Sequence, residues 1–275
     1  RDRPPGEPKH AWVLRPAALE AENDSTWCAF DLERPRQSIE GDLRPPNASA
    51  VAMVGRAAAQ RSKKTWTLDW DGRRHAVALT TRKDEETITV EVSKGDTSKT
   101  RTFVAFVQGW RPRGAAREAY EAHTKRSHDG NDEELRLFFE VGADETRPGL
   151  IHCTLPTRVR APTGRGTHLD GPFLLSVDRG SLDGTHAWNA ALLQNGLGEL
   201  FAKLLRWAAK ACRAAEDQDK AKVLKDAYGR LPALVRDAEG RLSTTVAGAP
   251  VALHALDSAL KREALLPCLP LGTFK

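Results

Sequence analysis

Four arginines stand within residues 151–182, and arginine has the clearest chemical use of any side chain in this stretch. Its planar guanidinium stays protonated at any working pH and donates several charge-assisted hydrogen bonds to phosphate. Near Gly164 and Gly166 lie three of the four arginines, Arg158, Arg160 and Arg165. This pattern predicts a loop whose arginine side chains and backbone amides face phosphate. An exposed basic turn is the alternative. Arg179 stands apart from these three and directly follows an apolar run.

Two predicted strands position these arginines. Residues 150–155 and 173–177 are short apolar runs bounded by Gly and Pro, which is the pattern of buried strands. Arg179 therefore falls where the second strand ends, so that rigid backbone would aim its side chain. Its alternative role is an ordinary ion pair with Asp178 or Asp183.

A longer pattern of residues runs through this stretch and into the apolar run that follows it. Its members are Leu155, Pro156, Thr157, Thr163, Gly164, His168, Asp170, Gly171, Phe173, Leu175, Ser176, Asp178, Arg179, Trp188, Asn189, Leu192 and Leu193. Their order resembles the region that follows the ATP-binding domain in sacsin-like proteins. Those proteins belong to the GHKL ATPases, whose best known members are the ninety-kilodalton heat-shock chaperones. The resemblance implies a chaperone-type α/β middle domain, and it implies that Arg179 reaches the γ-phosphate of ATP held by another domain.

The sequence lacks the motifs of a complete nucleotide site. A GHKL site needs a helix with the pattern E-x-x-x-N, which activates water and holds magnesium, and a D-x-G-x-G loop. Neither pattern is present, and no Gly-x-x-x-x-Gly-Lys-Ser/Thr phosphate loop replaces them. The resemblance therefore implies that ATP and Mg reach this chain only through a GHKL-type ATP-binding domain or subunit. A homo-oligomer is a further expectation for partners.

Histidine, serine and cysteine offer weaker alternatives. His152, His168 and His186 lie close in sequence, but no carboxylate or cysteine stands at helical ligand spacing, so ordinary polar histidines are expected rather than a metal site. Ser176, His168 and Asp178 are the residue types of a hydrolase, yet they lack the G-x-S-x-G context. The four cysteines are far apart with no C-x-x-C pair, which predicts reduced core thiols.

Composition and charge bound the function. The 275 residues carry a net charge of +5, and no apolar run reaches the length of a membrane span. We therefore expect a soluble, cytoplasmic protein. Residues 56–130 hold 16 Lys and Arg against ten Asp and Glu, and such mild basicity usually means a solvated face. The alternative function is a basic module that binds nucleic acid or another protein and has no part in ATP chemistry.

Periodicity predicts strands first and helices later along the chain. We expect an α/β (α+β) domain with a mixed sheet over residues 1–182 and a mainly helical part over residues 183–275. A core that continues across this boundary is the alternative. Gly196 and Gly198 predict a bend or break in the first long helix, because each glycine weakens a helix by about 1 kcal/mol relative to alanine.

The individual elements follow from the same patterns. Strands alternate apolar and polar residues, an Asp-Gly pair predicts a hairpin, and apolar residues three and four apart predict helices. Trp66, Trp70, Phe103 and Phe106 are expected in the core of the sheet. The expected elements are a helix at 48–60, antiparallel strands at 65–70, 73–81, 87–93 and 100–107, a helix at 115–125, a strand at 135–141, helices at 183–215, 217–228 and 255–265, and a hairpin within 240–251.

Overall fold

The chain divides into two compact units, Arg1–Pro45 and Pro46–Lys275. In the first unit, β1 (Leu14–Pro16) pairs antiparallel with β2 (Phe30–Leu32). All elements described below belong to the second unit. The computed structural model describes residues 14–16, 30–32, 52, 56, 65–70, 73–82, 85–94, 96–143, 146, 148–153, 155–176 and 180–262.

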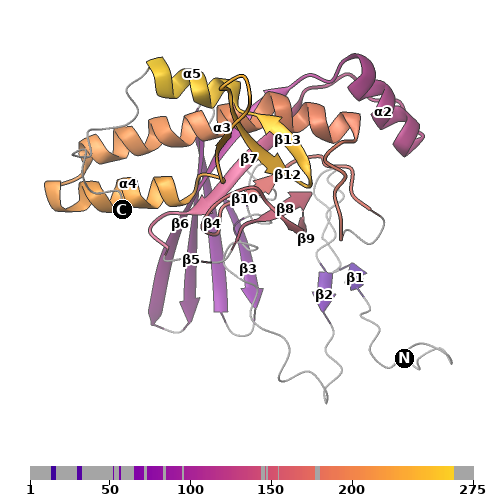
Figure 1. Ribbon diagram of the computed structural model, residues 1–275. Helices are drawn as coiled ribbons and strands as arrows, with labels where there is room; N and C mark the ends of the chain where they lie inside the picture. Colours follow the sequence, from indigo (N-terminus) through magenta and orange to yellow (C-terminus); the bar gives the residue numbers. More distant parts are fainter. Residues whose placement is uncertain are drawn as a thin grey trace. The chain divides into compact units, whose positions relative to one another are not determined.

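A mixed sheet of eight strands is the frame of the second unit (Figure 1). The predicted antiparallel strands are confirmed, because the first four strands follow one another as hairpins in both sequence and space. One pair, β10 with β8, runs parallel. In spatial order the strands are β3 (Thr65–Trp70), β4 (Arg73–Arg82), β5 (Glu85–Lys94), β6 (Thr97–Trp110), β7 (Glu133–Glu140), β10 (His168–Asp170), β8 (Leu150–Cys153) and β9 (Leu155–Arg160).

The sheet buries apolar side chains on both faces, because successive residues of a strand point to opposite sides. On the first face, Phe106 and Leu137 belong to the larger hydrophobic cluster, which also contains the helices. On the second face, Phe103 stacks on Phe138 with the ring centroids 5.4 Å apart, within a smaller cluster that includes Ala52. The predicted core positions of Phe103 and Phe106 are confirmed, on opposite faces. The side chains of Trp66 and Trp70 lie outside the described part.

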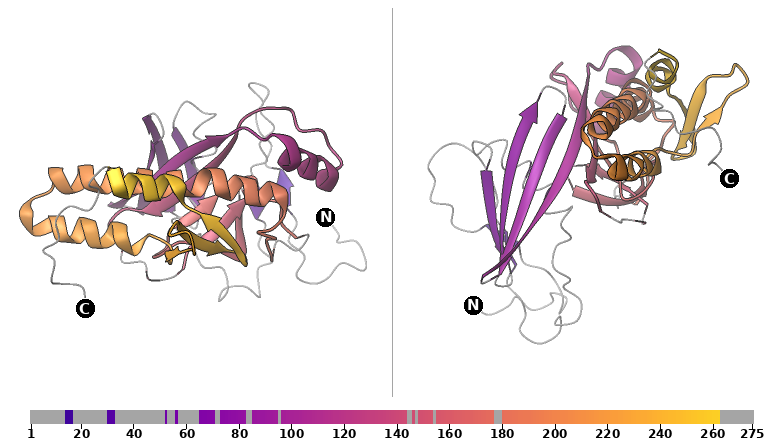
Figure 2. Two further views of the ribbon diagram at one scale, coloured as in Figure 1. Left: turned by 45° about the horizontal axis from the view of Figure 1, so that its top comes forward. Right: turned by 90° about the vertical axis from the view of Figure 1, so that its left-hand side faces the viewer.

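Four helices are described beyond the two helical residues 52 and 56. The predicted helices of the C-terminal part are confirmed, and the two longest lie beside the first face of the sheet (Figures 1 and 2). In the view on the left of Figure 2, α5 lies alongside α3, and α2 lies near the beginning of α3. The helices are α2 (Gly114–Thr124), α3 (Ala187–Ala214), α4 (Asp217–Gly229) and α5 (His254–Arg262).

The predicted break at the two glycines of α3 is wrong, because the helix runs unbroken for 28 residues. Both glycines serve close packing instead. A Cβ at Gly196 would lie 2.7 Å from Cδ2 of Leu135 on β7, and one at Gly198 would lie 3.2 Å from Cα of Leu253. Tertiary contacts therefore require the small residues and offset their cost in helix propensity.

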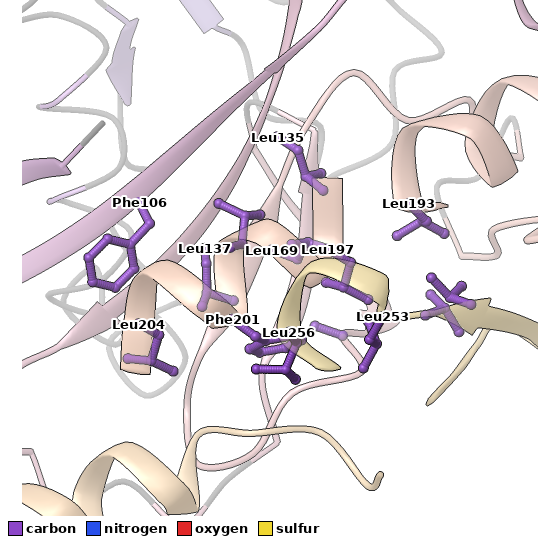
Figure 3. Close-up of a cluster of buried hydrophobic side chains, with 14 of the residues drawn as sticks. Phe106, Leu135, Leu137, Leu169, Leu193, Leu197, Phe201, Leu204, Leu253 and Leu256 are labelled. Atoms are coloured by element: carbon purple, nitrogen blue, oxygen red, sulfur yellow. The ribbon is translucent and has the colours of Figure 1, made fainter. Parts of the chain in front are cut away.

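The larger hydrophobic cluster joins strands and helices into one core (Figure 3). Leu137 and Leu169 of the sheet meet Leu197 and Phe201 of α3, and Leu256 of α5 belongs to the same cluster. Residues on both sides of position 182 thus contribute to the same cluster. A small antiparallel sheet, which contains the predicted hairpin, adds to it: β11 (Val235–Arg236), β12 (Leu242–Val246) and β13 (Ala249–Ala252).

The prediction of a strand at residues 173–177 is wrong. In the described residues of this run, the backbone makes only an isolated antiparallel bridge between Leu175 and Leu182. The predicted helix at residues 48–60 is described only at Ala52 and Arg56, which are helical, and its other residues lie outside the described part. Among the described helices, none combines the length and the apolar character needed to cross a membrane.

Candidate functional site

Leu175, Ser176, Ser181 and Leu182 form a closed loop base. The amide of Ser176 donates to the carbonyl of Ser181 at 3.1 Å, and the amide of Ser181 donates to Oγ of Ser176 at 2.9 Å. The hydroxyl of Ser176 also donates to the carbonyl of Ser181 at 3.2 Å. Arg179, the predicted phosphate-contacting residue, lies in the chain between these two serines, and residues 177–179 are outside the described residues.

Asn189, in the first turn of α3, ties both arms of this loop to the helix. Its side-chain Oδ1 accepts from the amide of Leu174 at 2.9 Å, and its Nδ2 donates to the carbonyl of Leu174 at 2.9 Å. The same Nδ2 donates to the carbonyl of Asp183 at 3.0 Å. Asn189 is fully buried, so these bonds form away from water, where a broken one would be costly. The loop base is therefore fixed to the beginning of α3.

Trp188 and His186 complete the anchor. The indole Nε1 of Trp188 donates to the carbonyl of Pro172 at 2.7 Å, and the ring packs between Trp110 and Tyr120 with centroid distances of 5.1 and 4.5 Å. Nδ1 of His186 accepts from the amide of Trp188, which caps the beginning of α3. Trp188 and Asn189, which both carry the sequence resemblance, thus hold the loop to the start of α3, and His186 caps the helix.

Asp183 directly follows the loop base and precedes α3. Its Oδ1 accepts from the hydroxyl of Thr185 at 2.6 Å and from the amide of Thr185 at 2.8 Å. These bonds stabilise the carboxylate, and the hydroxyl bond is the largest cause of the lowered pKa of Asp183. Asp183 therefore has local partners that shape the turn before α3.

The three arginines of the predicted phosphate loop do not share one loop. Arg158 and Arg160 belong to strand β9, where Arg160 is exposed and pairs in register with Leu150. The side chain of Arg158 lies outside the described part. Arg165 lies in the following loop, where a Cβ at Gly229 would sit 2.7 Å from its Cδ and Nε. The arginine side chain therefore packs against the end of α4.

The glycines and amides of residues 161–167 are used in packing. The amide of Gly164 donates to the carbonyl of Arg230 at 3.2 Å, and the amide of Thr167 donates to the carbonyl of Gly164 at 3.2 Å. A Cβ at Gly164 would lie 1.9 Å from the carbonyl oxygen of Gly229, so only glycine fits there. This close approach explains the glycine by backbone packing onto α4.

Arg230, which follows α4, is the anchor that the sequence analysis missed. Its guanidinium is 1% exposed and donates to both carboxylate oxygens of Asp226 and to the carbonyl of Glu140 at 2.7 Å. It also lies over the ring of Phe139 at 4.3 Å and donates to the carbonyl of Arg165 at 3.3 Å. Burial lowers the pKa of Arg230, and Asp226 opposes that effect. Only the four-residue spacing of Asp226 and Arg230 signalled this contact in the sequence.

The second face of the sheet carries charged residues as well as apolar ones. Arg56 and Glu86 form a buried ion pair, with Nη2 3.0 Å from Oε1. Arg136 on β7 lies opposite Asp170 on β10, with Nη1 3.7 Å from Oδ2. Burial is the main cause of the lowered pKa of Arg136, and the nearby charge of Arg56 adds to it. These contacts hold β5, β7, β10 and residue 56 together.

Two of the three histidines considered as metal ligands meet on this second face. Nε2 of His152 lies 3.1 Å from Nδ1 of His168, which also accepts from the amide of Leu150 at 3.2 Å. We therefore assign the shared proton to Nε2 of His152. Its buried Nδ1 has no hydrogen-bond partner among the described residues, and burial lowers the pKa of His152 to about 4. His186 instead contacts the ring of His123.

The alternative chemistries find little geometric support in the described residues. No three His, Cys, Asp or Glu side chains of the described part are grouped so that they could share a metal ion. Ser176 uses its hydroxyl to close the loop base, while His168 pairs with His152, so both side chains have structural contacts. Asp178 lies outside the described residues. Of the cysteines, Cys153 and Cys212 are described and both are free thiols.

Comparison with known proteins supplies no relative: no protein-family model, no curated protein and no solved structure matches the chain. The loop base, its ties to α3 and the sequence resemblance are therefore the grounds for a functional proposal.

Proposed function

We propose that this chain is the module that follows the ATP-binding domain in a sacsin-like, GHKL-type ATPase. In this proposal Arg179 contacts the γ-phosphate of ATP that another domain or subunit binds together with Mg. The chain itself completes the catalytic site and converts closure of that site into movement. It would act as an accessory part of the ATPase, because its sequence has no nucleotide-binding motifs of its own.

The observation that carries the proposal is the clamped loop base. Ser176 and Ser181 close the loop by three hydrogen bonds, and Asn189 ties the adjoining backbone of Leu174 and Asp183 to α3. A side chain that enters a neighbouring site must be held by a supported backbone, since small displacements weaken transition-state contacts strongly. A loop with this base suits the presentation of Arg179 to a partner domain.

The chemistry that follows is electrostatic. ATP and Mg, when held by the partner domain, supply the phosphoryl group and its leaving group. Arg179 would donate charge-assisted hydrogen bonds to phosphate oxygens as negative charge moves during transfer. In other phosphoryl-transfer systems an arginine supplied from outside the nucleotide pocket contributes about 10³ to 10⁵ in rate. Arg179 therefore acts mainly on turnover.

The length of α3 supports the coupling part of the proposal. The helix begins at the loop, extends for 28 residues and so spans about 42 Å. It packs on β6, β7, α4 and α5 along the way. A shift of the loop base on contact with nucleotide would therefore move a rigid element that reaches most of the second unit.

The test is steady-state ATP hydrolysis by the assembly with its ATP-binding domain. Arg179→Ala should lower kcat by at least about tenfold with little change in KM, because the contact strengthens in the transition state. Arg179→Lys should restore activity only in part, since an ammonium keeps the charge but loses the planar fork. Arg213→Ala, which changes an exposed arginine in the last turn of α3, is the matched control and should keep full turnover. Full turnover in Arg179→Ala would exclude the proposed role.

A further inference from the structure

A surface groove runs along α3 on the side that faces α2 and α5. One hollow of about 480 Å³ lies between α3 and α5, and a second of about 380 Å³ lies between α3 and the start of α2. The two hollows share Asn195, so they adjoin along α3, and together we call them the α3 groove. In Figure 2 the two bounding helices lie at different points along α3, as this arrangement requires.

The centre of the α3 groove is lined by the amide side chains of Gln194 and Asn195 and by the carboxylate of Glu199. Gly198 lets α3 approach the backbone of Leu253 closely, since a Cβ there would lie 3.2 Å from Cα of Leu253. Gln194 joins α3 to β13, since its Nε2 donates to the carbonyl of Pro250 at 3.2 Å and its Oε1 accepts from the amide of Ala252 at 3.1 Å. These contacts fix this side of the groove to β13, which lowers the cost of ordering it when a chain binds.

The ends of the α3 groove are basic. Arg113 stands at the α2 end and Arg262 at the α5 end, and both are exposed. Arg206 also lines the α5 end, but it makes another interaction of its own. Arg111 also lines the α2 end, but it is neutralised by Asp132 at 2.6 Å. Glu199 is the one carboxylate among the residues that line the two hollows. The groove thus presents guanidinium groups at its ends, separated by neutral amide side chains and a single carboxylate.

We propose that the α3 groove binds an acidic peptide segment of a partner protein, with carboxylates toward both ends of the segment. Guanidinium groups pair with carboxylates through charge-assisted hydrogen bonds, while the central amide side chains suit a polar backbone. From Ala191 to Arg206 the helix rises by about 22 Å. An extended segment of about seven residues covers that distance. This partner site is independent of the role of Arg179.

The charge pattern favours a peptide over a nucleic acid. A single strand places a phosphate at every nucleotide, so one phosphate would meet Glu199 and others would face the uncharged Gln194 and Asn195. Among the described residues that line the hollows, the aromatic rings are Trp110 in one and His254 in the other, whereas proteins that bind single strands use several stacking rings in succession. Binding of an oligonucleotide is therefore the competing outcome of the test.

The experiment is fluorescence anisotropy with a labelled, end-blocked peptide that has two glutamates on each side of a Ser-Gly-Ser centre. Its control replaces all four glutamates by glutamine. We expect the glutamate peptide to bind at least about tenfold more tightly, with the difference shrinking as salt is raised. Arg113→Gln with Arg262→Gln should weaken glutamate-peptide binding by about tenfold, because exposed ion pairs each contribute modestly.

Two further variants make the result specific. Lys94→Gln with Lys99→Gln removes the same charge from exposed positions near the β5–β6 turn and should change the affinity by less than about twofold. Glu199→Gln should raise the affinity by about threefold, because it removes the opposing carboxylate. An equal loss in both double variants would overturn the site. Tighter binding of oligo-thymidine than of the glutamate peptide, lost only in the groove variant, would also overturn the peptide assignment.

Discussion

The side chain of Asn189 pairs with both backbone polar groups of Leu174, at 2.9 Å for each hydrogen bond. A helix side chain thus takes the place that a neighbouring strand would occupy in a sheet. The backbone of this apolar run is satisfied without a ladder, which explains why residues 173–176 form a loop and not the predicted strand. The pairing also ties Leu174, five residues before Arg179 in the chain, to α3.

Asn189→Asp should lower the free energy of unfolding by about 3 kcal/mol, because the change removes both donors and sets a buried carboxylate against two carbonyls. In this variant, the deuterium exchange of the amides of Leu174 and Ser181 should also speed up more than that of the other amides of the second unit. Urea unfolding and hydrogen exchange measure the two effects. Asn195→Asp, at an exposed position of the same helix, is the control and should cost less than about 1 kcal/mol. Equal effects at both positions would contradict the anchoring role.

Arg230→Met should destabilise the protein by about 3 to 5 kcal/mol, because it leaves Asp226 and the carbonyl of Glu140 without their buried partner. A second change, Asp226→Leu, should recover part of the loss in the double variant. Thermal or urea unfolding checks both. Arg241→Met breaks an exposed pair with Asp237 and should cost less than about 1 kcal/mol. A tolerated Arg230→Met would show that the guanidinium is not the anchor of residues 161–167.

Acid should weaken the fold through His152, whose pKa is lowered to about 4 by burial. In the unfolded chain this histidine has a pKa near 6.5. At a pH above about 6.5 it is therefore neutral in both states, and its burial does not oppose folding. The stability is lost as the pH falls from about 6.5 to 4, and the difference between the two pKa values corresponds to about 3 kcal/mol. The pH dependence of unfolding should therefore be flatter for His152→Gln. The exposed His254→Gln should keep the parent slope, and an identical slope in both variants would refute this assignment.

The isolated chain should show no tight binding of Mg-ATP in calorimetry. The acid, the asparagine and the glycine loop that a GHKL site requires are missing from its sequence. The assembly with a GHKL-type ATP-binding domain should bind the nucleotide in the same measurement, which serves as the positive control. Stoichiometric, high-affinity binding by the isolated chain would reveal a nucleotide site that the sequence motifs do not predict.

Local patterns determined most of the elements. Alternation of apolar and polar residues predicted strands β3 to β6, because a strand must bury one side of its pleat whatever its neighbours are. Apolar residues three and four apart likewise predicted α3, α4 and α5. The same reasoning predicted that Phe103 and Phe106 lie in the core. Their spacing of three residues puts them on opposite faces of the sheet, and only the structure shows that both faces are buried.

Long-range contacts decided the rest. The parallel pairing of β10 with β8 joins residues that are 18 apart in sequence, and no local pattern encodes the partner of a strand. The unbroken α3 depends on Leu135 and Leu253 filling the space left by Gly196 and Gly198. The three arginines that the sequence predicted in one phosphate loop also lie apart: Arg158 and Arg160 are in β9, and Arg165 packs against the end of α4. Arg230, which the sequence analysis did not identify, is the buried anchor. The sequence by itself determined which segments bury an apolar face, whereas the tertiary structure decided where each polar group finds its hydrogen bonds, because those partners come from distant parts of the chain.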